Sequence, residues 1–205
     1  MNLIVISNFI TKKEQIELKE YAAAMPVTEI ANEHIRAVND QIKGRSILCD
    51  LTKTDISKGV SAFQGDATEI KEVPALFHNI GCRIAEKLKI CADHAFVQCI
   101  ASGDGGRVAP HYDAAAPGYV TYKCNVAIDG PAKDLVFIAG RPVEVQPGDL
   151  YCFEANLYKH WAEVATARTL LSYGFMLPLQ DLGWSKDDAR VRMSDRIWSR
   201  FSRPV

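Results

Sequence analysis

The sequence predicts a mainly β chain with flanking helices, an α+β arrangement in which a jelly-roll barrel is backed by N-terminal helices. Apolar residues recur at helical spacing in two segments of the first half of the chain, whereas the second half contains short apolar runs at regular intervals. Helices followed by many short strands are typical of such a barrel. Glycine and proline separate the short runs, at 103–106, 117–118, 130–131, 140–142 and 147–148.

Two helices are expected before the barrel. Thr11 and Glu14 have the spacing of a capping box, and the helix that they open should end near Pro26. Its apolar residues are Ile16, Leu18, Tyr21 and Ala22. A second helix is expected over about 73–91, where the residues at helical spacing are Leu76, Phe77, Ile80, Ile84 and Leu88.

Strands account for most of the remaining predicted structure. Residues 2–6 alternate and predict a short first strand, whereas residues 27–70 carry no pattern that assigns them. Ser185 and Asp188 have the spacing of another helix cap, which predicts a C-terminal helix over about 186–200. The barrel strands are expected at about 95–101, 119–128, 134–138, 142–145, 149–153, 160–164 and 168–177.

Composition excludes several classes of protein. The 205 residues are 48% apolar, which suits one compact domain with its own core. A formal net charge of −1 provides no field that would attract nucleic acid or an anionic membrane. No apolar run reaches the roughly 18 residues of a membrane span, and the N-terminus has no signal-peptide pattern. The six cysteines form no CxxC pair, which favours reduced thiols and a cytoplasmic protein.

Three residues have the chemistry and the order of a metal site. His111 and Asp113 are two residues apart, so on one strand their side chains would point to the same face. His160 would come from a neighbouring strand. Two imidazoles and a carboxylate are the ligands of a 2-His-1-carboxylate iron site, which leaves other positions on the metal open. Arg168 follows on the next predicted strand, and its guanidinium could bind a carboxylate in bidentate fashion.

The order of these residues and the segments around them carry a resemblance to a known family. A glycine-rich turn precedes His111 and Asp113, the turn Pro147-Gly148-Asp149 leads into a strand that ends at Phe153, and His160 and Arg168 follow. Over about residues 96 to 178, this pattern resembles the double-stranded β-helix core of the Fe(II)/2-oxoglutarate-dependent oxygenases, in particular the prolyl-hydroxylase-like branch. The resemblance implies one oxygenase domain over 1–205. Its expected parts are helical support with a substrate lid over 1–94, the catalytic core over 95–178 and the C-terminal helix over 179–205.

The same resemblance implies Fe(II), the co-substrate 2-oxoglutarate and O2. His111, Asp113 and His160 would be the metal ligands, and Arg168 would bind the distal carboxylate of 2-oxoglutarate. Many relatives carry a hydroxyl two residues after this arginine, but here that position is Leu170. A second anchor is therefore expected from the strand over 119–128, where Asn125 and Tyr122 are the predicted co-substrate contacts. Tyr122 and Lys123 are equally well explained as ordinary strand residues.

The expected activity is that of a dioxygenase that hydroxylates or otherwise oxidises its substrate, with succinate and CO2 as co-products. The carboxylate of Asp113 favours hydroxylation over halogenation, since the halogenating relatives carry a small residue there. A small metabolite or an amino-acid side chain, free or in a peptide, is the favoured substrate. An AlkB-like nucleic-acid demethylase would carry a second arginine where this chain has Gly174. A cupin-like metal-binding or sensor protein without turnover is the other alternative, and it would have no need of Arg168.

Overall fold

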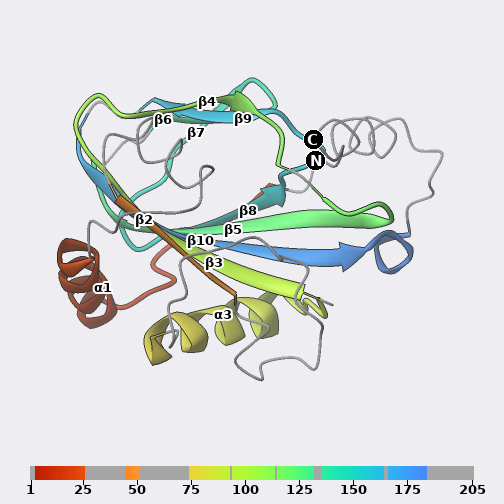
Figure 1. The fold of residues 1–205 in the computed structure, drawn as a ribbon, viewed down its shortest axis with the longest axis horizontal. Coiled ribbons are helices and arrows are strands. Elements are labelled where there is room, and N and C mark those ends of the chain that lie inside the picture. Colours follow the sequence, from red (N-terminus) through yellow and green to blue (C-terminus); the bar gives the residue numbers. More distant parts are fainter. Residues whose placement is uncertain are drawn as a thin grey trace, which may run out of the picture.

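Two antiparallel sheets lie face to face in the computed structural model, and helices α1 (Lys12–Ala24) and α3 (Ala75–Leu88) cover the outer face of the larger sheet (Figure 1). The structure describes residues 3–25, 45–50, 74–92, 94–113, 115–131, 135–163 and 166–183. Six of the described strands form the major sheet, in the order β1 (Ile4–Ile6), β8 (Leu150–Glu154), β5 (Tyr119–Asp129), β10 (Arg168–Pro178), β3 (His94–Ser102) and β2 (Arg45–Asp50). Four form the minor sheet, in the order β4 (Arg107–His111), β9 (His160–Glu163), β6 (Leu135–Ile138) and β7 (Arg141–Val143).

This architecture confirms the predicted fold class, a mainly β jelly roll backed by N-terminal helices. Many of the pairings within each sheet join strands distant in sequence: β5 lies between β8 and β10, and β9 lies between β4 and β6. A short 3-10 helix, Leu179–Leu182, follows β10. No helix in the described ranges is long and apolar enough to cross a membrane. The predicted helix over 186–200 lies outside the described residues. So does most of the segment 27–70, where a lid was expected, since only its residues 45–50 are described.

Helix α1 begins at the predicted capping box. The Thr11 hydroxyl accepts a hydrogen bond from the Glu14 backbone N–H at 3.2 Å, and the Glu14 carboxylate accepts one from the Thr11 backbone N–H at 2.8 Å. Leu18 and Ala22 are buried against the major sheet as expected, but Ile16 is 57% exposed. Four predicted apolar positions therefore do not form one buried face, because Ile16 lies on the solvent side of the helix.

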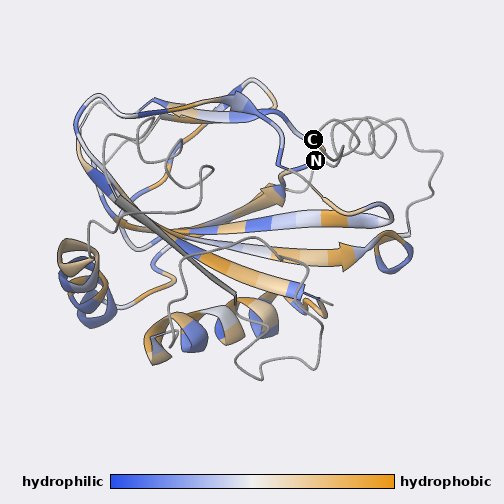
Figure 2. Ribbon diagram, viewed as in Figure 1, coloured by the Kyte–Doolittle hydropathy of each residue, from blue (hydrophilic) through white to orange (hydrophobic). Residues whose placement is uncertain are grey.

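Helix α3 packs its apolar face on the same side of the major sheet. Phe77, Ile80 and Ile84 are fully buried, as the helical spacing predicts, and Figure 2 shows apolar stretches of β3 and β10 next to this helix. The Tyr173 hydroxyl of β10 donates a hydrogen bond of 2.6 Å to the carbonyl of Phe77. The helix layer and the sheet are therefore joined by apolar burial and by a buried polar contact.

Two strands were not expected from the sequence. One is β2, in the segment that carried no pattern. The other is β4, which was absent from the predicted strand ranges although His111 was expected on a strand. This strand contains Pro110 and has a register shift between Val108 and His111. Proline lacks the N–H that a central strand must donate, but β4 is at the edge of the minor sheet among the described strands, where proline is tolerated. The remaining strand boundaries agree with the predicted ones to within a few residues.

The turn Pro147-Gly148-Asp149 leads into β8 and has a structural role. Gly148 has a φ of +103°, a conformation that L side chains rarely adopt. The buried Asp149 carboxylate accepts hydrogen bonds from the backbone N–H groups of Asn8 and Gln146, both at 3.0 Å. The turn thereby ties the segment that follows β1 to the start of β8.

Alternation along β5 divides its side chains between two environments. Tyr122, Cys124 and Val126 belong to the apolar cluster between the major sheet and the helices. Lys123 and Asn125, which alternate with them, point to the other face, toward the minor sheet. A second apolar cluster fills part of the space between the sheets, with residues such as Ile138 of the minor sheet and Phe153 of the major sheet. The polar residues of β5 therefore face the barrel interior.

Candidate metal centre

His111 and His160 occupy directly opposite positions on the paired strands β4 and β9. Their ring centroids are 4.2 Å apart. Asp113 completes the group: its Oδ1 lies 3.1 Å from Nε2 of His111 and 3.3 Å from Nε2 of His160. One ligand atom from each of the three residues lies within 4.8 Å of the others, so they could hold a single metal ion. The structure thus brings together the three residues that the sequence predicted as ligands.

Asp113 reaches this position by a different route from the one predicted. Strand β4 ends at His111, and Asp113 lies beyond it rather than on the same strand. Its backbone N–H donates a hydrogen bond of 3.1 Å to the carbonyl of Ala155, in the segment after β8. The position of the Asp113 backbone is therefore fixed by its hydrogen bond to Ala155, after β8 of the major sheet, and not by the two-residue repeat of a strand.

Backbone carbonyls define which nitrogen of each imidazole is available. Nδ1 of His111 lies 2.7 Å from the carbonyl oxygen of Ala109, and Nδ1 of His160 lies 3.1 Å from that of Tyr158. A carbonyl only accepts, so Nδ1 must carry the proton in both rings. The lone pair of each neutral imidazole is then on Nε2, the atom that faces Asp113, which is the tautomer that a metal ligand needs.

The protonation states of the group suit metal binding. Burial raises the pKa of Asp113, but the opposing interactions, of which that with the Lys123 ammonium at 2.8 Å is the strongest, hold that pKa well below 3.8. Burial lowers the pKa of His160 below 6.5, and the opposing attraction of Asp113 does not reverse the shift. Near neutral pH the site therefore offers an ionised carboxylate and a neutral imidazole, the forms that bind metals.

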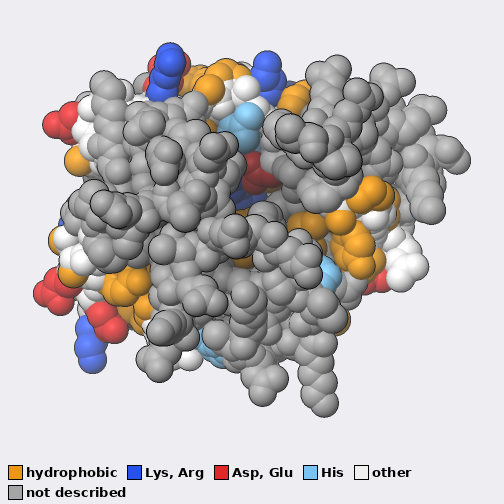
Figure 3. Space-filling view, in the orientation of Figure 1, with side chains coloured by type: hydrophobic (Ala, Val, Ile, Leu, Met, Phe, Trp, Pro, Cys, Tyr) orange, Lys and Arg blue, Asp and Glu red, His pale blue; other side chains and the backbone are white. Residues whose placement is uncertain are grey.

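Nε2 of His160 is the atom of the group that is left without a hydrogen bond among the described residues. Nε2 of His160 is buried and makes no hydrogen bond within the described part of the chain, because its approach to Asp113 lacks hydrogen-bond geometry. Buried polar atoms are normally satisfied, so this nitrogen fits a metal ligand. The side chain of His111 is 37% exposed and that of His160 only 7%, so solvent reaches the group from the His111 side. In Figure 3, histidine, acidic and basic side chains are visible near the centre of the face in view.

Arg168 and Asn125 both lie on the interior face of the major sheet. Arg168 is the first residue of β10 and is 5% exposed, and Asn125 of β5 is 6% exposed. Alternation along β10 puts Arg168 and Ser172 on the face opposite Leu171 and Tyr173, which pack against the helices. The structure therefore places these two of the three predicted co-substrate residues in the buried polar part of the barrel.

Ser172 is a residue that the sequence analysis missed. It pairs with Asn125 in the register of β5 and β10, and both the Ser172 hydroxyl and the Asn125 Oδ1 are buried without a hydrogen-bond partner among the described residues. The signal was present, because Ser172 is four residues after Arg168 and a strand returns to the same face every two residues.

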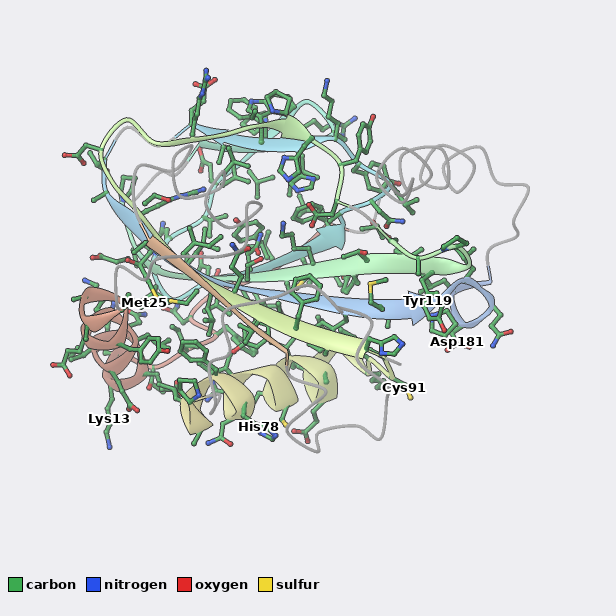
Figure 4. All side chains as sticks on the ribbon, viewed as in Figure 1. Lys13, Met25, His78, Cys91, Tyr119 and Asp181 are labelled. Atoms are coloured by element: carbon green, nitrogen blue, oxygen red, sulfur yellow. The ribbon has the colours of Figure 1, made fainter. Side chains whose placement is uncertain are left out.

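Tyr122 is not brought to the site. It lies on the helix side of β5, in the apolar cluster, where burial and the nearby Cys152, Cys124 and Glu154 raise the pKa of its hydroxyl well above 10. The strand alternation already put Tyr122 on the face opposite Lys123 and Asn125, and the structure keeps it there, so the expected contact between Tyr122 and the co-substrate is not formed from the interior side. His78, a histidine that does not belong to the group, lies on α3 in the helix layer, away from the space between the sheets (Figure 4).

No protein-family model matches the sequence, and no curated protein matches it significantly. Solved structures do match the fold. The viral collagen prolyl hydroxylase of Paramecium bursaria chlorella virus-1 is 11% identical, with a TM-score of 0.53 over 87% of this chain and 91% of that chain. A prolyl-4-hydroxylase of Pseudomonas putida is 12% identical, with a TM-score of 0.51 over 84% of this chain and 91% of that chain.

A shorter similarity involves a larger enzyme. The chain spans 20% of the length of the salicylate 1,2-dioxygenase of Pseudoaminobacter salicylatoxidans, at 12% identity and a TM-score of 0.33 over 40% of this chain. The two prolyl hydroxylases, in contrast, match over most of both chains. Together with the described sheets, they show that the chain has the jelly-roll fold of these enzymes.

Proposed function

We propose that this chain is an Fe(II)- and 2-oxoglutarate-dependent dioxygenase. The observation that carries the proposal is the convergence of Nε2 of His111, Nε2 of His160 and Oδ1 of Asp113. The interior face of the major sheet also carries two buried polar side chains, those of Arg168 and Asn125. Histidine and carboxylate ligands suit iron, and three of them leave positions for a bidentate co-substrate and dioxygen. When bound, the iron would supply the oxidative decarboxylation of 2-oxoglutarate to succinate and CO2 and the oxidation of the substrate.

The protein's own residues would bind, orient and exclude water. His111, Asp113 and His160 would hold the iron, with the imidazoles kept in the Nδ1–H form by backbone carbonyls. Arg168 would bind the distal carboxylate of 2-oxoglutarate through its guanidinium. The Ser172 hydroxyl, buried without a hydrogen-bond partner among the described residues, would donate to the same carboxylate, and the Asn125 amide would line that end of the pocket. No protein general base is needed in this scheme.

The substrate in this proposal is an amino-acid side chain, free or in a peptide, or a small metabolite, which would be hydroxylated. The similarity in fold to enzymes named as prolyl hydroxylases supports a side-chain substrate. The net charge of −1 argues against nucleic acid. The alternative of a metal-binding or sensor barrel without turnover leaves the buried Arg168 without a role.

An anaerobic titration tests the proposed function. The metal-free protein is mixed with Fe(II) and then with 2-oxoglutarate, while the visible metal-to-ligand charge-transfer band is followed. The band should form only after both additions and should be absent from the His111→Ala variant. Tight iron binding without the band would exclude the oxygenase proposal and favour a sensor or storage barrel. A panel of amino acids, peptides and metabolites, scored by succinate release, then identifies the substrate class.

A further inference from the structure

Asp113 uses its two carboxylate oxygens for different partners. Oδ1 faces Nε2 of both histidines, at 3.1 and 3.3 Å. Oδ2 lies 2.8 Å from Nζ of Lys123. The Asp113 and Lys123 side chains are only 17% and 18% exposed, so this ion pair is largely shielded from water. The lysine therefore acts on one oxygen of the carboxylate, while the other oxygen points to the metal position.

The two partners are held to very different degrees by the fold. Lys123 is in the middle of β5 and pairs with Gly174 of β10 on one side and with Phe153 of β8 on the other. The Phe153 ring in turn contacts the imidazole of His160 edge to face, with centroids 4.9 Å apart. Asp113, in contrast, lies beyond the end of β4, where no strand pairing orients its side chain.

Rotation of the carboxylate matters at such a position. The terminal torsion of aspartate is broad and roughly two-fold, so the backbone alone does not select which oxygen faces the metal, or whether both do. A carboxylate that turned both oxygens toward the metal would occupy an additional coordination position. That position is one of those that a bidentate co-substrate and dioxygen require.

We propose that Lys123 is a positioning residue that holds Oδ2 of Asp113, so that Asp113 gives the metal Oδ1 alone and leaves the next coordination position for the co-substrate. This inference rests on the proposed metal site and deepens it. It assigns to Lys123 a role different from direct contact with 2-oxoglutarate, since the ammonium is engaged with the ligand carboxylate. Outer partners of this kind orient metal ligands and tune what the metal can bind.

Co(II) provides a test that does not depend on turnover, because its visible absorption reports the number and arrangement of ligands. The Co(II) spectrum and the Kd for 2-oxoglutarate are measured for the wild type, for Lys123→Met, which keeps the length of the side chain without its charge, and for Lys123→Arg. Lys87→Met is the matched control, because Lys87 is exposed on α3, on the other side of the major sheet.

Lys123→Met should change the spectrum of the Co(II) protein before any co-substrate is added, and it should raise the Kd for 2-oxoglutarate by about 10-fold. Lys123→Arg should bring both the Co(II) spectrum and the Kd back toward the wild-type values. Lys87→Met should give the same spectrum and the same Kd as the wild type. An unchanged Co(II) spectrum in Lys123→Met together with a raised Kd would overturn the proposal, because Lys123 would then be a direct anchor of the co-substrate. An unchanged spectrum with an unchanged Kd would also overturn it.

A second measurement serves if Lys123→Met does not fold. The infrared carboxylate bands of Asp113 in the wild-type Co(II) protein should have the wide separation of a carboxylate bound through one oxygen, and a narrow separation would exclude the proposed role. Failure of the proposed function can be distinguished from failure of the role proposed for Lys123. If the wild type binds Co(II) and the spectrum responds to Lys123→Met, but 2-oxoglutarate does not bind, Lys123 positions a ligand in a protein that is not an oxygenase. If the wild type binds no Co(II), the inference is wrong together with the metal site.

Discussion

His111 and His160 face each other across the β4–β9 pair, with their ring centroids 4.2 Å apart and each Nδ1 against the carbonyl of the residue two positions earlier. The same local contact thus fixes both rings in the form that presents Nε2. A slip of one residue in the β4–β9 register would turn one imidazole to the outer face of the minor sheet. Pairing of two short strands therefore determines whether the metal centre exists.

Loss of either imidazole should abolish metal binding while the fold persists. His160→Ala removes one of three ligands, so the Kd for Co(II), measured by calorimetry, should rise by more than about 100-fold, beyond the usual effect of an outer partner. His78→Ala is the control, because His78 lies on α3 away from the site. If His160→Ala bound Co(II) as tightly as the control did, His160 would not be a ligand.

Replacement of Arg168 should weaken the co-substrate and spare the metal. Arg168→Met keeps an apolar stem in the buried position and removes the guanidinium. Loss of one partner of a buried charge pair costs about 2 kcal/mol or more, so the Kd for 2-oxoglutarate should rise at least about 30-fold. Arg141→Met, on the exposed side of β7, is the matched control. Co-substrate affinity that did not change in Arg168→Met would exclude Arg168 as the anchor.

Gly174 leaves room for an aromatic ring inside the barrel. It pairs with Phe96 of β3 and with Lys123 of β5, and a Cβ at Gly174 would overlap the Phe96 ring. Gly174→Ala should therefore lower the free energy of unfolding by about 1–3 kcal/mol, the usual cost of overpacking. Urea unfolding measures this value.

A double-mutant cycle identifies the cause of that loss. In the Phe96→Leu background the cost of Gly174→Ala should become smaller, because the smaller side chain can move away from the added methyl group. The same cost in both backgrounds would show that the two residues are not coupled, and that the loss arises from the strand backbone.

The ion pair between helices α1 and α3 should make stability depend on pH. Burial raises the pKa of Glu14, but hydrogen bonds from the Thr11 backbone and from Arg83, at 2.7 Å, outweigh this and leave the pKa below 4.5. A depressed pKa in the folded state means that the stabilisation is present above the unfolded value and is lost as the pH falls through the folded value. Glu14→Gln removes the charge and keeps an acceptor for the cap.

The expected difference in the free energy of unfolding between the wild type and Glu14→Gln is about 0.5–1 kcal/mol at neutral pH, since Arg83 is partly exposed and the pair is screened. It should be smaller at about pH 3, because the stabilisation is lost as the pH falls through the lowered pKa of Glu14 in the folded state. Urea unfolding at the two pH values gives the comparison. An equal difference at both would mean that the charge of Glu14 is not its source.

Local patterns in the sequence predicted much of the fold. The capping box at Thr11 and Glu14 defines where α1 begins through contacts within four residues, and short apolar runs bounded by glycine and proline predicted most of the strands. Strand β4 was missed because Pro110 and the glycines before it indicate a turn, and only the edge position in the sheet makes that proline acceptable. Ile16 is exposed because it is two residues from Leu18 and six from Ala22, and residues at these spacings do not share a helix face.

By itself, the sequence determined which residues are candidates for the chemistry: His111, Asp113 and His160 in order, followed by Arg168. It also determined a fold class able to bring them together. Only the tertiary structure decided how they meet. The opposition of His111 and His160, the contact of Lys123 with Asp113 and the pairing of Ser172 with Asn125 all depend on the register between strands distant in sequence. The two-residue period of a strand predicts which side chains share a face of the sheet. Which of the two faces is buried, and which residue of the neighbouring strand lies opposite, follows only from the strand pairing.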